Sequence, residues 1–111
     1  METKASMIMT TVKDRGAAAE MAAFLIQEKV AACVQEVAIH SHYHWEGQTK
    51  SDPEVLLLIK TAADRVEDAI AAIRRKHTYQ VPEILVTPVV GGLGAYLQWV
   101  RDETRPATQQ A

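Results

Sequence analysis

The chain has 111 residues, of which 12 are basic and 14 acidic, and its formal net charge is −2. A chain of this length forms one domain and can bury about two-thirds of the surface that its unfolded form exposes. Because charges of both signs are interspersed and no apolar run approaches the ~18 residues of a membrane span, the sequence predicts no binding to nucleic acid and no insertion into a membrane.

Three elements are predicted in the first half of the chain: a strand over residues 7–12, a helix after Asp14 and a long strand over residues 33–45. The first strand has apolar residues on both faces, as a strand inside a covered sheet has. Asp14 is a favourable N-cap residue, and apolar side chains recur behind it at helical spacing. In the long strand the odd positions, from Cys33 to Trp45, look like the inner face. Its length is more than twice the common value of about 5–6 residues, so we expect it to outrun its domain, to bend at a bulge, or both.

A hairpin and a second helix follow. Residues 46–53 are polar, contain Gly47 and end at a proline, so they predict the loop of the hairpin. Residues 55–60 form the return strand, whose run of apolar side chains indicates burial on both faces and therefore a central position. Thr61 and Asp64 fit a capping box at the start of the second helix.

The last third of the chain predicts one more strand and a short helix. Residues 81–90 have a proline near each end, which suits an edge or bulged strand. A glycine-rich turn leads into a helix over residues 95–101. We treat residues 1–105 as a single domain and predict a disordered tail over residues 106–111.

Three histidines alternate along the long strand, at His40, His42 and His44. Because strand side chains alternate between faces, these imidazoles lie on one face and Tyr43 and Trp45 on the other. Neutral imidazole is the commonest ligand for copper, zinc and nickel, so this histidine ladder is a candidate metal site. The alternative is a polar outer face, since one strand supplies no carboxylate or thiolate ligand and no residues that would orient the imidazoles for a metal ion. Tyr43 and Trp45 are predicted to pack at the base of the hairpin.

The order β-α-β-β-α-β predicts an α+β fold of the ferredoxin-like kind, a βαββαβ sandwich with an extended β-hairpin and a short C-terminal helix. Six blocks of the sequence read MTTV at 9–12, KVAACV at 29–34, YHWEG at 43–47, LIKT at 58–61, YQVPEI at 79–84 and YLQW at 96–99. In order and spacing these blocks resemble the CutA family of divalent-cation tolerance proteins, and the resemblance spans roughly residues 6 to 103.

This resemblance implies a compact homotrimer similar to the PII signalling proteins, in which the hairpin of each subunit reaches its neighbour. It also implies a role in tolerance of divalent cations, notably Cu²⁺, and no established catalytic reaction. The copper ligands discussed for the family are a cysteine in the first strand, a histidine just ahead of the Tyr-x-x-Pro-Glu block, and that glutamate. The corresponding residues here are Thr10, His77 and Glu83. The cysteine is therefore missing, and His77 and Glu83 form a candidate metal site that water or a neighbouring subunit would have to complete.

Two hypotheses of different classes follow from these features. The first is a trimeric protein that binds or responds to Cu²⁺ or another divalent cation, through His77 and Glu83 or through the histidine ladder. The second is a PII-like regulatory scaffold that binds a small anionic metabolite or a partner protein in clefts between subunits. The missing cysteine favours the second hypothesis, and the added histidines favour the first.

An enzyme is not predicted. The sequence has no supported Ser-His-Asp order and no glycine-rich phosphate loop after the first strand. Its one cysteine, Cys33, follows two alanines in an apolar setting and resembles a small core residue more than a nucleophile. A single cysteine and a start without a secretory signal pattern predict a cytoplasmic protein.

Overall fold

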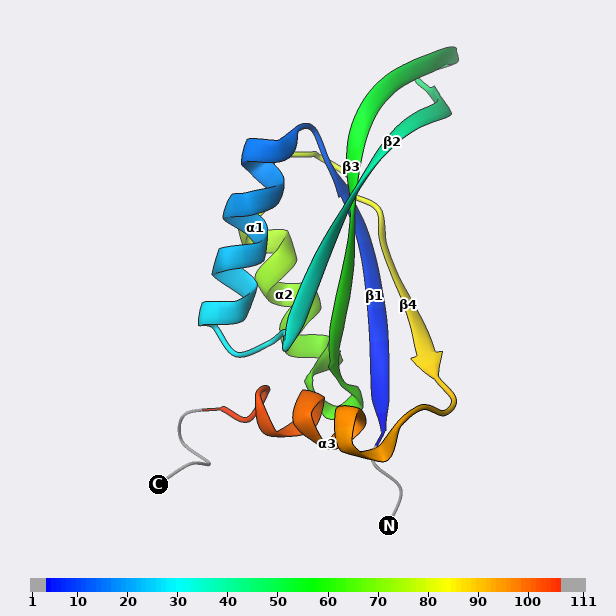
Figure 1. The fold of residues 1–111 in the computed structure, drawn as a ribbon. Coiled ribbons are helices and arrows are strands. Elements are labelled where there is room, and N and C mark those ends of the chain that lie inside the picture. The colour runs from blue at the N-terminus through cyan, green and yellow to red at the C-terminus, as the bar shows by residue number, and fades with distance from the viewer. Residues whose placement is uncertain (1–3, 107–111) are drawn as a thin grey trace.

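A four-stranded antiparallel sheet is covered on one face by two helices, and a third helix lies across one end (Figure 1). The structure is a computed structural model, and it describes residues 4–106. Of the predicted tail over 106–111, residues 107–111 lie outside the described residues. The elements are β1 (Ala5–Val12), α1 (Arg15–Gln27), β2 (Cys33–Trp45), β3 (Gln48–Ala62), the 3₁₀ turn η1 (Ala63–Arg65), α2 (Val66–Lys76), β4 (Ile84–Val89) and α3 (Gly94–Asp102). Within residues 4–106 no helix combines the length and the hydropathy needed to cross a membrane.

The strand order in the sheet is β2-β3-β1-β4, and every neighbouring pair is antiparallel. This order confirms the predicted ferredoxin-like βαββαβ fold with its extended hairpin and C-terminal helix. The prediction of an edge strand near the C-terminus is also confirmed, because β4 pairs with β1 alone and carries Pro88. A proline is tolerated there, since the ladder hydrogen bond that it cannot donate has no partner strand on the open side.

The core lies between the sheet and the helices α1 and α2. Ile8 of β1 and Leu57 and Ile59 of β3 are fully buried there. They pack in one cluster with apolar side chains of the two helices, which include Leu25 and Ile73. The amphipathic spacing of each helix therefore turns its apolar stripe onto the sheet.

The strand register decides which face of β2 meets this core. Val34 pairs with Ile59, and directly paired residues of antiparallel strands point to the same side of the sheet. Because Ile59 is buried beneath the helices, the even positions of β2 face the helices and the odd positions face away. The prediction that the odd positions form the inner face is wrong, and Val37 on that face is 41% exposed. Both faces of the sheet carry apolar side chains, so alternation alone does not show which face the helices cover.

The hairpin is longer than the sequence predicts, because its loop is not residues 46–53. The turn consists of Glu46 and Gly47, whose φ angles of 50° and 76° are those of a two-residue hairpin turn of the primed kind. β3 begins at Gln48 and runs through Pro53, which pairs with His40. These residues are polar because both faces of the hairpin lie outside the helix-covered core, not because they form a loop. The expectation that β2 outruns its domain is confirmed, since the hairpin projects well beyond the helices (Figure 1).

The two long helices begin in different ways. Asp14 caps α1 as predicted, and its Oδ1 accepts a hydrogen bond of 2.8 Å from the backbone N–H of Ala17. The predicted capping box of Thr61 and Asp64 is wrong. Thr61 lies within β3 and is fully buried, and the 3₁₀ turn η1 precedes α2 without a side-chain cap. Asp64 instead accepts two hydrogen bonds, of 2.6 and 2.8 Å, from the guanidinium of Arg105.

The Asp64→Asn variant is expected to be less stable than the parent chain at neutral pH by at most about 1 kcal/mol, because the carboxylate is half exposed. The Arg105 guanidinium lowers the pKa of Asp64 below its ordinary value of 3.8. A carboxyl whose pKa is depressed by folding stabilises the fold above its unfolded pKa and loses that contribution as the pH falls through its folded pKa. Chemical denaturation at pH 7 and at pH 3 should therefore show the difference shrinking in acid. An equal difference at both pH values would contradict this role.

Candidate functional site

A cleft of about 610 Å³ lies where the hairpin leaves the sheet, and we call it the hairpin-base cleft. It is on the face of the sheet that points away from α1 and α2, because Tyr43 and Trp45 of β2 occupy odd positions. The segment between α2 and β4 closes its other side with Tyr79 and Glu83. The residues that line it are Thr11, Ser41, His42, Tyr43, Trp45, Lys50, Asp52, Glu54, Tyr79, Gln80, Val81 and Glu83.

Two tyrosine–carboxylate hydrogen bonds organise the hairpin-base cleft. The Tyr43 hydroxyl donates to Oδ2 of Asp52 at 2.6 Å, and the Tyr79 hydroxyl donates to Oε2 of Glu54 at 2.7 Å. The hydrogen bond to Asp52 raises the pKa of Tyr43, and burial followed by the hydrogen bond to Glu54 raises the pKa of Tyr79. Both hydroxyls therefore stay protonated at neutral pH. They fix two carboxylates in place and do not serve as bases.

The charge of the hairpin-base cleft is negative. Its lining includes the carboxylates of Asp52, Glu54 and Glu83 and one ammonium group, that of Lys50. Opposite charges attract across a cleft wall and like charges repel, so this lining favours a cationic ligand over an anionic one. Two aromatic side chains on the hairpin, at positions 43 and 45, supply apolar surface beside the carboxylates.

His77 is held by hydrogen bonds to both ring nitrogens. Its Nδ1 accepts from the backbone N–H of Tyr79 at 3.1 Å, so Nδ1 is unprotonated. Its Nε2 therefore carries the proton and donates to the carbonyl oxygen of Thr11 at 2.8 Å. The ring also contacts the Tyr79 ring at a tilt of 53°, with 4.7 Å between centroids. A metal ion at His77 would have to replace one of these two hydrogen bonds.

The structure does not bring the predicted pair of His77 and Glu83 to one cleft. Glu83 lines the hairpin-base cleft, whereas His77 lines a second cleft of about 320 Å³ between the start of α1 and the end of α2. Thr10, at the position of the family cysteine, is fully buried, and its hydroxyl has no hydrogen-bond partner within the described part of the chain. In residues 4–106 no three His, Cys, Asp or Glu side chains are grouped so as to hold a metal ion. A complete metal site within one subunit is therefore not formed by these residues.

The histidine ladder has the geometry that its spacing predicts. His40, His42 and His44 pair with Pro53, Ser51 and Thr49 and share one exposed face of the hairpin. Tyr43 and Trp45 point to the other face and are 42% and 39% exposed, so their predicted packing at the base of the hairpin remains to be tested in an assembled form.

Sequence analysis missed the carboxylates and the tyrosine that shape the hairpin-base cleft, namely Asp52, Glu54 and Tyr79. The sequence predicts a loop over residues 46–53 and a return strand that begins only at residue 55, so the alternation within residues 48–54 does not enter that prediction. Once β3 is extended, Lys50, Asp52 and Glu54 fall on the same face as Tyr43. That alternation is the signal that could have found them.

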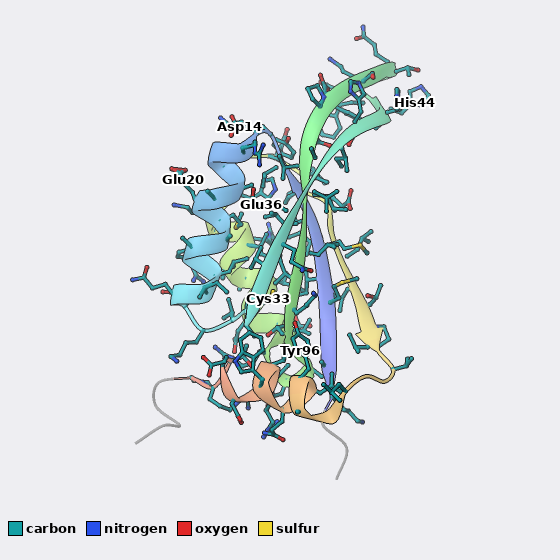
Figure 2. All side chains as sticks on the ribbon, in the orientation of Figure 1. Asp14, Glu20, Cys33, Glu36, His44 and Tyr96 are labelled. Atoms are coloured by element: carbon teal, nitrogen blue, oxygen red, sulfur yellow. The ribbon has the colours of Figure 1, made fainter. Side chains whose placement is uncertain are left out.

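The sheet face opposite the helices carries many apolar side chains and is largely uncovered, except at the end where α3 packs (Figure 1). We call it the open sheet face. The register places on it the apolar residues Met7, Met9, Val37, Ile39, Leu56, Leu58, Leu85 and Val89. At the α3 end Tyr96 lies beside Cys33, as Figure 2 shows. Contiguous apolar surface of this kind marks a site of interaction.

Together, the ferredoxin-like sheet, the projecting hairpin and the open sheet face define a PII-like α+β protein. A solved structure described as the PII-like protein CutA from Nostoc sp. PCC 7120 in apo form superposes with a TM-score of 0.86 at 29% identity and covers 91% of this chain and 98% of that chain. The model of the CutA1 divalent ion tolerance protein family matches residues 6–103. The chain belongs to the CutA1 family.

The similarity to two relatives covers most of this chain but different shares of the relatives' own lengths. The chloroplastic protein CutA of Arabidopsis thaliana is 41% identical over 100 residues, which are 89% of this chain and 55% of the plant protein. The divalent-cation tolerance protein CutA of Thermus thermophilus is 35% identical over 99 residues, which are 88% of this chain and 96% of that protein. The chain thus spans about half the length of its plant relatives and nearly all of the bacterial one.

Proposed function

We propose that this protein confers tolerance of divalent cations, acts as a homotrimer in the cytoplasm and catalyses no reaction. The observation that carries the proposal is that the acidic hairpin-base cleft and the apolar open sheet face lie on the same side of the sheet. A subunit that covers the open sheet face would therefore border the cleft and complete it. The name of the Thermus relative, a divalent-cation tolerance protein, supports the same function.

The homotrimer is supported by two features of a single subunit. Val37, Leu85 and Val89 are between 37% and 54% exposed on the open sheet face, and apolar side chains gathered on one exposed face mark a site of interaction. The hairpin also extends past its own helices, where it has no core of its own to pack on. A neighbouring subunit would cover the apolar open sheet face and would give the hairpin a surface on which to pack.

Glu83 and His77 remain the proposed ligands for Cu²⁺ or another divalent cation. Glu83 contributes a carboxylate to the hairpin-base cleft, next to those of Asp52 and Glu54. Carboxylate and imidazole groups of a neighbouring subunit would raise the number of ligands to the three or four that a tight site needs. His77 would join such a site through its unprotonated Nδ1, which would give up its hydrogen bond from the Tyr79 N–H, while Nε2 keeps its hydrogen bond to the Thr11 carbonyl.

The alternative function, a PII-like scaffold for a small anionic metabolite, is less favoured by the charge of the cleft. Three carboxylates face one ammonium group in the hairpin-base cleft. In the second cleft Lys13 and Lys76 are balanced by Asp14 and Glu20. Neither lining attracts an anion, whereas the first attracts a cation.

Two measurements test the proposed function. A host that lacks its own CutA1-family protein should grow at higher Cu²⁺ concentrations when it expresses this chain. Calorimetric titration of untagged, metal-stripped protein with Cu²⁺ should show binding that weakens at least about tenfold in Glu83→Gln, since the loss of a ligand costs at least as much as the loss of its supporting contacts. Glu67→Gln, the same change at an exposed position of α2 that lines neither cleft, should bind as the parent does. Unchanged growth would contradict the tolerance role, and unchanged binding in Glu83→Gln would remove that ligand.

A further inference from the structure

The histidine ladder forms a surface that supplies none of the ligands proposed above. His40, His42 and His44 lie on the helix-side face of the hairpin, and of the three only His42 also borders the hairpin-base cleft, which is lined mainly from the other face. In Figure 2 His44 lies near the tip of the hairpin, beyond the end of the helix layer. All three side chains are exposed, so their imidazoles can change rotamer without disturbing the core.

We propose that this face of the hairpin binds one borderline divalent ion, such as Cu²⁺ or Ni²⁺, which His42 chelates together with either His40 or His44. The rings of His40 and His42 are already neighbours, with 5.2 Å between their centroids and 40° between their planes. Two nitrogen ligands of one ion lie about 3 Å apart, since each metal–nitrogen bond is about 2 Å. Small rotamer changes bring two imidazoles of adjacent ladder positions to that spacing.

His44 lies two positions from His42 on the same face of β2, as His40 does on the other side. Alternate residues of a strand are about 7 Å apart at Cα, and both pairs obey that spacing. His42 belongs to both pairs, so the two pairs cannot be occupied at once by different ions. The proposed stoichiometry is therefore one ion per subunit.

The surroundings of the ladder suit a cation and imidazole ligands. The β3 residues that pair with the three histidines are Thr49, Ser51 and Pro53, none of which is charged. The nearby ammonium group of Lys50 lies on the opposite face, because Lys50 pairs with Tyr43. Nε2 of His40 is 2.8 Å from the Ser51 hydroxyl oxygen, and in the tautomer in which Nε2–H donates to this oxygen the unprotonated Nδ1 can bind the ion. Imidazole prefers copper, nickel and zinc, and affinity rises toward Cu²⁺ along the divalent series.

The shared position of His42 makes the proposal testable with three single variants. In titrations of untagged, metal-stripped protein with Cu²⁺, His42→Asn should lose at least about tenfold in the affinity of this site, because both pairs are broken. His40→Asn and His44→Asn should each lose about twofold, since one pair remains. The residues are exposed, so the variants are expected to fold, which circular dichroism will verify. Electron paramagnetic resonance of the Cu²⁺ complex should show two coordinated nitrogens in the parent chain.

Two outcomes would overturn the proposal. Unchanged Cu²⁺ affinity in His42→Asn would show that the ladder is only a polar outer face with adventitious binding. Equal losses of Cu²⁺ affinity in all three variants would contradict a site in which His42 pairs with either His40 or His44. These outcomes are distinguished from the test of the proposed function by His40→Asn and His44→Asn, because neither residue lines the hairpin-base cleft that contains Glu83. The inference goes beyond that function, since the ladder would bind an ion whether or not the protein confers tolerance.

Discussion

The Leu85→Asp variant is expected to be a monomer in solution under conditions in which the parent chain forms the proposed trimer. Leu85 lies on the open sheet face of β4 and is 54% exposed in the single subunit, so an aspartate there is hydrated in the monomer. In the proposed trimer the same carboxylate would be buried without a partner, which costs several kcal/mol for each subunit. Each 1.4 kcal/mol is about a tenfold change in the association constant. Light scattering over a range of protein concentrations measures the change.

Val86→Asp is the matched control for this experiment. Val86 follows Leu85 on the same edge strand and is 40% exposed, but it pairs with Ile8 and points to the helix side. The same charge is therefore introduced one residue away on the other face, and the trimer should persist. A trimeric Leu85→Asp would contradict the open sheet face as the interface. A monomeric parent chain would contradict the homotrimer itself.

The Leu57→Ala variant is expected to lose about 2–5 kcal/mol of stability, the range found when a leucine is truncated in a well-packed core. Leu57 is fully buried in the central strand β3 and packs in the cluster beneath α1 and α2. A loss of that size is a large part of the about 5–15 kcal/mol that holds a domain folded. Chemical denaturation at one fixed subunit concentration is the measurement, because association contributes to apparent stability.

Leu93→Ala applies the same truncation where the side chain is 75% exposed, just before α3. Its expected effect is within about 0.5 kcal/mol. Similar losses in the two variants would show that Leu57 does not have the core position described above. A large loss in Leu57→Ala alone would confirm that the helix-side face of β3 carries the folding core.

Part of the candidate site could be predicted from the sequence, because it depends on spacing within one strand. The shared face of His40, His42 and His44 follows from the two-residue period alone. The relation between His77 and Glu83 could not be predicted in this way. They are six residues apart across an irregular segment, and its path sends them to different clefts. The pair of Tyr79 and Glu54 could not be predicted from local spacing either, because the two residues are 25 positions apart in the chain.

The sequence by itself determined the order of elements, the ferredoxin-like fold, the cap at Asp14 and the overlong strand β2. These depend on local spacing, on residue type and on connections that permit few topologies. The tertiary structure alone decided which face of β2 the helices cover and where the hairpin turns. It also decided which carboxylates meet Tyr43 and Tyr79. These features depend on register between strands and on a second layer packing on one side of a sheet that is apolar on both, and such long-range choices leave no local mark in the sequence.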